Sequence, residues 1–119
     1  MKTIIAGGRD ITDFSQVVQA VSQSGFTITE VVSGRQRGVD TLGEQYADLK
    51  KLPIAPFPAD WTAHGKAAGP IRNAQMARYA DALIAIWDGE SKGTKNMINQ
   101  AKKEGLMVFV YMIDTSTKG

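Results

Sequence analysis

Three glycine-containing segments of this chain carry backbone amides and side chains that could bind a phosphate group. In the first, Gly7 and Gly8 let backbone amides approach an anion closely, and Arg9 can donate two parallel hydrogen bonds to it. The alternative is a plain tight turn that leaves this arginine on the surface. We therefore treat the segment from Gly7 to Asp10 as a candidate phosphate loop.

The second and third segments each precede a predicted helix, whose first amides and dipole favour a bound phosphate. The second runs from Ser33 to Asp40, and Asp40 could either contact a ligand or cap the helix. The third runs from Asp88 to Thr94. The hydroxyl groups of Ser91 and Thr94 could hold phosphate oxygens, and the alternative for Thr94 is a simple N-cap.

Arg72 and Asn73 are further candidates, because the sequence places them in the first turn of a helix. A cation there opposes the helix dipole, so the position is more understandable if Arg72 faces an anion and Asn73 adds amide hydrogen bonds. A surface salt bridge is the alternative. Trp61, further upstream, could stack on a nucleobase or cover the sheet edge.

Other catalytic and cofactor motifs fit this sequence poorly. The segment 89–93 matches the G-x-S-x-G pattern of serine hydrolases, but that mechanism needs a histidine after the serine, and the single histidine, His64, precedes it. The dinucleotide fingerprint is absent from the first loop, and residues 93–95 reverse the order that a P-loop requires. One histidine without clustered carboxylates gives no metal site, so we expect neither metal nor cofactor.

The composition is that of one globular domain over residues 1–119, with 43% hydrophobic and 22% charged residues. The lack of cysteine excludes disulfides and thiol nucleophiles and suits a reducing cytoplasm. The longest apolar run, Ala82 to Trp87, is far shorter than a membrane span. A net charge of +2 with scattered basic residues is weak evidence for nucleic-acid binding, whereas one phosphorylated ligand is easily accommodated.

Short continuous apolar runs predict strands that are buried on both faces, as in a parallel sheet covered by helices. These runs are Thr3 to Ala6, Glu30 to Ser33, Ile54 to Phe57, Ala82 to Trp87 and Met107 to Tyr111. Between them, apolar residues recur at helical spacing. The four stripes are Phe14, Val17, Val18 and Val21; Val39, Leu42, Tyr46 and Leu49; Ile71, Ala74 and Ala77; and Met97, Ile98 and Ala101.

The first helix has the clearest ends, with a capping box at Asp13 and Gln16 and a terminating glycine at Gly25. The alternation of strands and helices predicts an α/β fold, a Rossmann-like three-layer α/β/α sandwich with a mostly parallel five-stranded sheet. Residues 52–69 contain the one long irregular stretch. Ligands bind beyond the carboxyl ends of such strands, which places all three glycine segments at one edge.

Together these motifs resemble the SLOG superfamily, and in particular its YspA-like branch of small bacterial and phage proteins. The resemblance rests on Ala6 to Asp10, on Ser33 to Asp40 with its Gly-Val-Asp ending, on Arg72 to Met76 and on Gly89 to Thr94. It runs from the first strand to the last. It implies a Rossmann-like domain that recognises nucleotides, nucleotide sugars or related signals, often as a dimer or larger homo-oligomer.

Two groups of relatives imply different activities. LOG-type phosphoribohydrolases cleave nucleoside monophosphates with an arginine, matched here by Arg72, and a glutamate, whose place is taken by Asn96. An amide is no general base, so only Glu90, in the same loop, could substitute. The DNA-processing protein A family binds single-stranded DNA, for which Arg35 and Arg37 could contact the backbone.

The sequence therefore predicts that the chain binds or senses a nucleotide or nucleotide-derived phosphate ligand. A LOG-like N-glycosidase with Arg72 and Glu90 as candidate catalytic residues is one alternative, and a single-stranded DNA-binding module is the other. The expected ligand-binding residues are Gly7, Gly8, Arg9, Asp10, Ser33, Gly34, Gly38, Asp40, Arg72, Asn73, Asp88, Gly89, Ser91, Gly93, Thr94 and Asn96.

Overall fold

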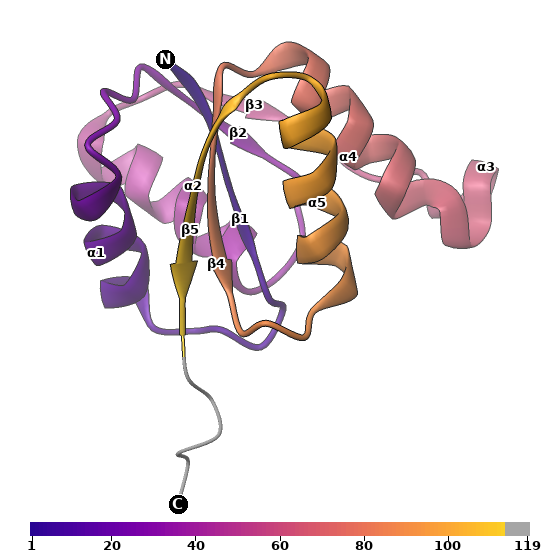
Figure 1. The fold of residues 1–119 in the computed structure, drawn as a ribbon, viewed down its shortest axis with the longest axis horizontal. Helices are drawn as coiled ribbons and strands as arrows, with labels where there is room; N and C mark the ends of the chain where they lie inside the picture. The colour runs from indigo at the N-terminus through magenta and orange to yellow at the C-terminus, as the bar shows by residue number, and fades with distance from the viewer. Residues whose placement is uncertain (114–119) are drawn as a thin grey trace, which may run out of the picture.

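Parallel strands form the centre of the molecule in the computed structural model, which describes residues 1–113. The sheet has five strands in the order β3-β2-β1-β4-β5, and every neighbouring pair runs parallel. All strands point the same way in Figure 1, so their carboxyl ends share one edge. The bounds are β1 Lys2–Gly7, β2 Glu30–Ser33, β3 Ile54–Pro56, β4 Ala82–Trp87 and β5 Met107–Met112.

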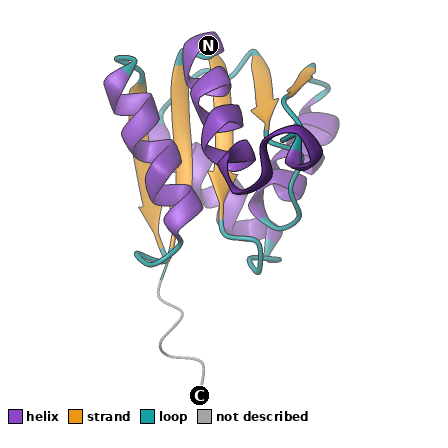
Figure 2. Ribbon diagram, turned by 90° about the vertical axis from the view of Figure 1, so that its right-hand side faces the viewer, coloured by secondary structure: helices purple, strands orange, loops and turns teal. Residues whose placement is uncertain are grey.

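Helices cover both faces of this sheet, as Figure 2 shows. Helices α1 (Phe14–Ser24) and α2 (Val39–Lys50) pack against one face, and α4 (Ala68–Tyr79) and α5 (Lys92–Lys103) pack against the other. The predicted α/β/α sandwich is confirmed, and the sheet is parallel throughout. No helix within residues 1–113 combines the length and apolar character needed to cross a membrane.

The continuous apolar strands are explained by the two cores that they separate. Along β1, Ile4 and Ala6 face the core beneath α4 and α5, while Ile5 faces the core beneath α1 and α2. Leu83 and Ile84 of β4 divide in the same way. Because successive side chains of a strand alternate between faces, a strand covered on both sides must be apolar at every position.

The segment expected to be irregular is partly helical. Helix α3 (Trp61–His64) is capped by the Asp60 carboxylate, which accepts a hydrogen bond from the Ala63 amide, and a 3-10 turn η1 (Gly65–Ala67) leads into α4. Helix α4 starts at Ala68 and so includes Pro70 in its first turn. A proline is tolerated there because the first amides of a helix need no partner within the helix. Arg72 is therefore in the second turn, and its predicted first-turn position is wrong.

The loop after β1 is locked onto the start of α2. The Val39 amide donates a hydrogen bond to the Gly8 carbonyl at 3.2 Å, so one N-terminal amide of this helix is already used. Gly38 has φ +82°, and a β-carbon there would collide with the carbonyl groups of Gly8 and Arg9. Gly38 thus allows two loops from separate parts of the sequence to approach closely.

We expect Gly38→Ala to lower the free energy of unfolding by about 3 kcal/mol, since it adds backbone strain to a backbone collision. Gly25→Ala is the matched control, because Gly25 also has a positive φ but has open space around it. Its loss should be about 1 kcal/mol. Urea denaturation of both variants measures the difference, and equal losses would show that the contact between the loops is unimportant.

Candidate functional site

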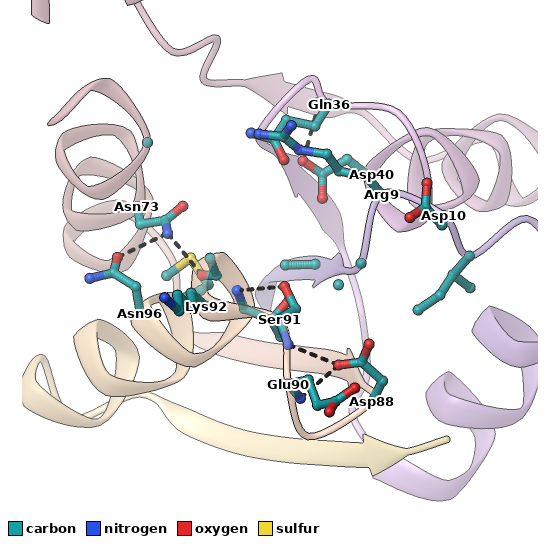
Figure 3. Close-up of a pocket in the computed structure, with 18 of the residues that line it drawn as sticks. Arg9, Asp10, Gln36, Asp40, Asn73, Asp88, Glu90, Ser91, Lys92 and Asn96 are labelled. Atoms are coloured by element: carbon teal, nitrogen blue, oxygen red, sulfur yellow. Dashed lines mark hydrogen bonds between the residues drawn. The ribbon is translucent and has the colours of Figure 1, made fainter. Parts of the chain in front are cut away.

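A cleft of about 1070 Å³ opens at the carboxyl ends of the strands. Its walls come from the β1–α1 loop, the first turn of α2, helix α4 and the β4–α5 loop (Figure 3). The three glycine segments and the Arg72 helix therefore do meet at one edge. The predicted residues that line this cleft are Gly7, Gly8, Arg9, Asp10, Asp40, Arg72, Asn73, Asp88, Glu90, Ser91, Gly93, Thr94 and Asn96.

Four of the predicted residues do not line the cleft. Ser33 is buried and donates its hydroxyl hydrogen to Glu44 at 2.6 Å. Gly34 lies beneath the side chains of Arg72 and Asp40, Gly38 packs on the β1–α1 loop, and Gly89, with φ +84°, forms a turn. These residues shape the loops that carry the lining groups.

Arg72 occupies the floor of the cleft and is only 5% exposed. Its Nη1 donates to the Gly34 carbonyl, and its Nε donates to Asn73 Oδ1 at 3.0 Å. Within residues 1–113, Nη2 has no hydrogen-bond partner and no carboxylate lies within 4.0 Å of the guanidinium. Burial lowers the pKa of Arg72, but an arginine remains protonated in proteins, so the floor of the cleft carries a positive charge.

Asp40 lies close to this cation without forming a salt bridge to it. Its carboxylate is 6% exposed and accepts a hydrogen bond from the Gln36 amide at 3.2 Å. Gln36 precedes α2, and the N-cap of that helix is Gly38, so Asp40 fastens the preceding loop rather than capping the helix. Burial raises the pKa of Asp40 to about 6, although the Gln36 amide and Arg72 both favour its ionised form.

Asn73 connects α4 to the start of α5. Its Nδ2 donates to Asn96 Oδ1 at 3.0 Å and to the Gly93 carbonyl at 3.3 Å, as the dashed lines in Figure 3 show. Asn96 occupies the position where the LOG-type resemblance would place a catalytic glutamate. Its oxygen accepts from Asn73, and its amide nitrogen has no hydrogen-bond partner among residues 1–113.

The N-terminus of α5 differs in detail from the prediction. Ser91 is the N-cap, and its Oγ accepts hydrogen bonds from the Thr94 amide and the Thr94 hydroxyl. Thr94 is therefore not the N-cap and is buried. Asp88 Oδ1 accepts from the amides of Glu90 and Ser91, which lowers the pKa of Asp88. Among the described residues, the amides of Lys92 and Gly93 remain unpartnered at this helix end.

Several lining residues were missed by the sequence interpretation. Lys92 belongs to the predicted third segment and was overlooked, and Gln36 belongs to the second. Residues 111 and 112 end β5 and residue 113 follows it, so the rule that sites form at the carboxyl ends of strands could have found them. Trp61, which is half exposed, lies against Gly69 and lines the cleft.

The single histidine, His64, does not approach Ser91, the serine of the G-x-S-x-G segment. His64 lines a separate cavity of about 200 Å³, which also contains Asp60 and Gln75, whereas Ser91 lines the main cleft. Arg72 borders both cavities. Residues 1–113 contain no group of three or more histidine, aspartate or glutamate side chains arranged to hold a metal ion.

Replacing Asp40 by asparagine should change how stability depends on pH. The folded-state pKa, about 6, lies above the ordinary 3.8, so the folded protein binds this proton more tightly than the unfolded chain. The stability that Asp40 contributes is complete below about pH 4 and is lost as the pH rises through about 6. This loss amounts to about 3 kcal/mol.

Asp40→Asn keeps an oxygen that can accept from Gln36 and removes the ionisation. We therefore expect the variant to gain stability relative to the parent chain as the pH is raised from about 4 to about 7 in urea denaturation experiments. Asp48→Asn, at an exposed position of the same helix, is the control. A difference between Asp40→Asn and the parent that does not vary with pH would contradict this interpretation.

Comparison with known proteins agrees with the fold and the motifs. Gene 61 protein of Mycobacterium phage D29 is 37% identical over 84 residues, which cover 66% of this chain and 67% of that protein. DNA processing protein A from Streptococcus pneumoniae has a similar fold, with a TM-score of 0.77 at 17% identity over 98% of this chain and 52% of that chain. This chain therefore spans about half of its length, and the likeness concerns the fold alone.

The family model described as the YspA, cpYpsA-related SLOG family matches residues 1–64. The match covers the first two glycine segments and ends before Arg72. The resemblance inferred from the motifs is confirmed, and the chain belongs to the YspA, cpYpsA-related SLOG family.

Proposed function

We propose that this chain binds or senses a nucleotide, or a nucleotide-derived phosphate ligand, in the cleft at the carboxyl ends of the strands. The observation that carries the proposal is the buried guanidinium of Arg72, whose two bonded nitrogens donate to neutral oxygens. A buried cation is costly unless an opposite charge compensates it. A ligand phosphate at Nη2 would supply that charge.

The surface salt bridge considered as the alternative for Arg72 does not describe its position. The side chain is buried, and the salt bridges within residues 1–113 involve only Arg35 with Glu44 and Arg37 with Asp10. Asp40 is nearby, but it forms no salt bridge to Arg72, and its carboxylate accepts from the Gln36 amide instead. These facts favour a ligand over an internal partner.

Other groups around Arg72 extend the site for a phosphorylated ligand. The amides of Lys92 and Gly93 and the positive end of α5 favour phosphate oxygens, and Arg9 adds a second guanidinium to the cleft. Asn96 offers an amide group whose nitrogen has no partner among residues 1–113, and Trp61 offers an exposed aromatic face on which a base could stack. Membership of the SLOG family and the fold shared with DNA processing protein A support a role linked to nucleotides or nucleic acid.

The two alternative activities have less support from the geometry. N-glycoside hydrolysis needs an ionisable group, which Asn96 lacks. Glu90 is exposed, and its backbone amide donates a hydrogen bond to the Asp88 carboxylate. For single-stranded DNA, Arg35 and Arg37 lie outside the cleft lining. The homo-oligomeric state and the cytoplasmic location remain predictions.

A thermal-shift screen with nucleotides tests the proposal. A ligand present at about a hundred times its Kd should add about 2.7 kcal/mol to the stability, which corresponds to roughly 10 °C in Tm for a domain of this size. Arg72→Ala should abolish the shift. Arg9→Ala, at an exposed position that does not disturb the fold, should weaken binding by roughly tenfold or more because it removes a charge-assisted hydrogen bond.

Arg78→Ala is the matched control, since Arg78 lies on α4 but is exposed and outside the cleft lining. It should leave the shift unchanged. A folded Arg72→Ala protein that kept the full shift, or a complete absence of shifts with nucleotides, would refute the proposal.

The hydrolase alternative has its own measurement. We expect incubation of the chain with each common nucleoside monophosphate to release no free base, because the position of the expected glutamate holds Asn96. Chromatography of a time course provides the answer. Base release that Glu90→Gln eliminates would favour catalysis over binding.

A further inference from the structure

The charged and polar side chains of the cleft are divided between two sides. Figure 3 shows Asn73, Lys92 and Asn96 on one side, and Asp10, Asp88 and Glu90 on the other. The first side comes from α4 and α5, and Lys92 and Asn96 are its available hydrogen-bond donors, because Asn73 donates internally. The second comes from the β1–α1 and β4–α5 loops, which follow adjacent strands, and carries these three carboxylates together with the single guanidinium of Arg9.

The carboxylate side keeps its negative charge. Hydrogen bonds from the Glu90 and Ser91 amides hold the pKa of Asp88 below its usual value, and Ser15 does the same for Asp13, which also lines the cleft. The one ion pair on this side within residues 1–113 joins Asp10 to Arg37 at 3.5 Å, and both side chains are largely exposed. Water screens such an exposed pair, so it compensates little of the charge.

The opposite side contains a guanidinium, that of Arg72, with one nitrogen free of hydrogen bonds to the described residues. Arg72 is 5% exposed, lines the cleft, and has Nη2 free of hydrogen bonds among residues 1–113. Since no buried side-chain nitrogen of the described residues is without a partner, Nη2 must be accessible to solvent from the cavities that Arg72 borders. One anionic group of a ligand could accept a hydrogen bond from Nη2 and balance the charge of Arg72.

We propose that the cleft selects a dipolar ligand with one phosphate group at Arg72 and hydroxyl or amino donors at the Asp88 and Glu90 side, and that its carboxylates exclude polyanions. This inference rests on the proposed function and specifies its ligand class, a singly phosphorylated nucleoside. Ribose hydroxyls or an exocyclic amine can donate to carboxylates. Additional phosphates or a DNA backbone would extend like charges toward Asp10, Asp88 and Glu90, where they are repelled.

Isothermal titration with AMP, ATP, the corresponding nucleotides of the other bases and a thymidine oligonucleotide tests this inference. For the base that binds best, we expect the monophosphate to bind at least about tenfold more tightly than the triphosphate at low salt, which is about 1.4 kcal/mol. Added salt screens the repulsion, so the ratio of the two affinities should narrow. The oligonucleotide should bind more weakly than the monophosphate.

The double variant Asp10→Asn and Glu90→Gln removes two negative charges from exposed positions of the carboxylate side. We expect the preference for the monophosphate over the triphosphate to fall by about tenfold in this variant. The control is Asp48→Asn with Glu104→Gln, which makes the same change of net charge at exposed positions outside the cleft lining. The control should retain the preference of the parent chain.

The possible failures are distinguishable. If nucleotides bind but the triphosphate or the oligonucleotide binds as tightly as the monophosphate, or if both double variants change the ratio equally, the charge selection is refuted and the proposed function stands. If no nucleotide binds to the parent chain, the proposed function fails, and the ligand class fails with it.

Discussion

The buried guanidinium of Arg72 places a positive charge where α4, α5 and the loop after β2 meet, and hydrogen bonds hold it in this position. Its hydrogen bond to the Gly34 carbonyl joins α4 to the loop after β2, and its bond to Asn73 extends the connection to α5 through Asn96. Side chains separated by many residues are thus brought into one network. The network ties α4 to the loop after β2 and to the first turn of α5, and so fixes these parts of the cleft relative to one another.

Glycines let the loops of the network come close together. Gly34 must lack a side chain because Arg72 and Asp40 occupy the space where one would lie, and Gly38 must lack one because the β1–α1 loop passes over it. Both glycines therefore allow close packing between segments that are distant in the sequence. A phosphate-binding pattern in the sequence and a packing requirement in the structure have the same local signature, which is glycine at a turn.

The helix ends at the cleft are not equally available to an anion. At α2, the Val39 amide already donates to Gly8, and Asp40 places a carboxyl group in the first turn. At the β4–α5 loop, Asp88 accepts from two amides in much the way that a bound anion would. The amides of Lys92 and Gly93 have no partner among residues 1–113 and belong to the same cleft as Arg72 and Asn96, which makes the α5 side the region that best suits a phosphate.

The sequence by itself determined the strands, the α/β/α architecture and the edge at which the cleft forms. These features follow from apolar runs, helical spacing and the placement of glycines, all of which are local patterns, and the motifs also identified the family. Only the tertiary structure decided the start of α4 before Pro70, the attachment of Asp40 to the Gln36 amide and the internal use of Ser33 by Glu44. Each of these depends on which donors, acceptors and charges the fold brings together, and whether a polar side chain is satisfied internally or left for a ligand is settled only when its neighbours are in place.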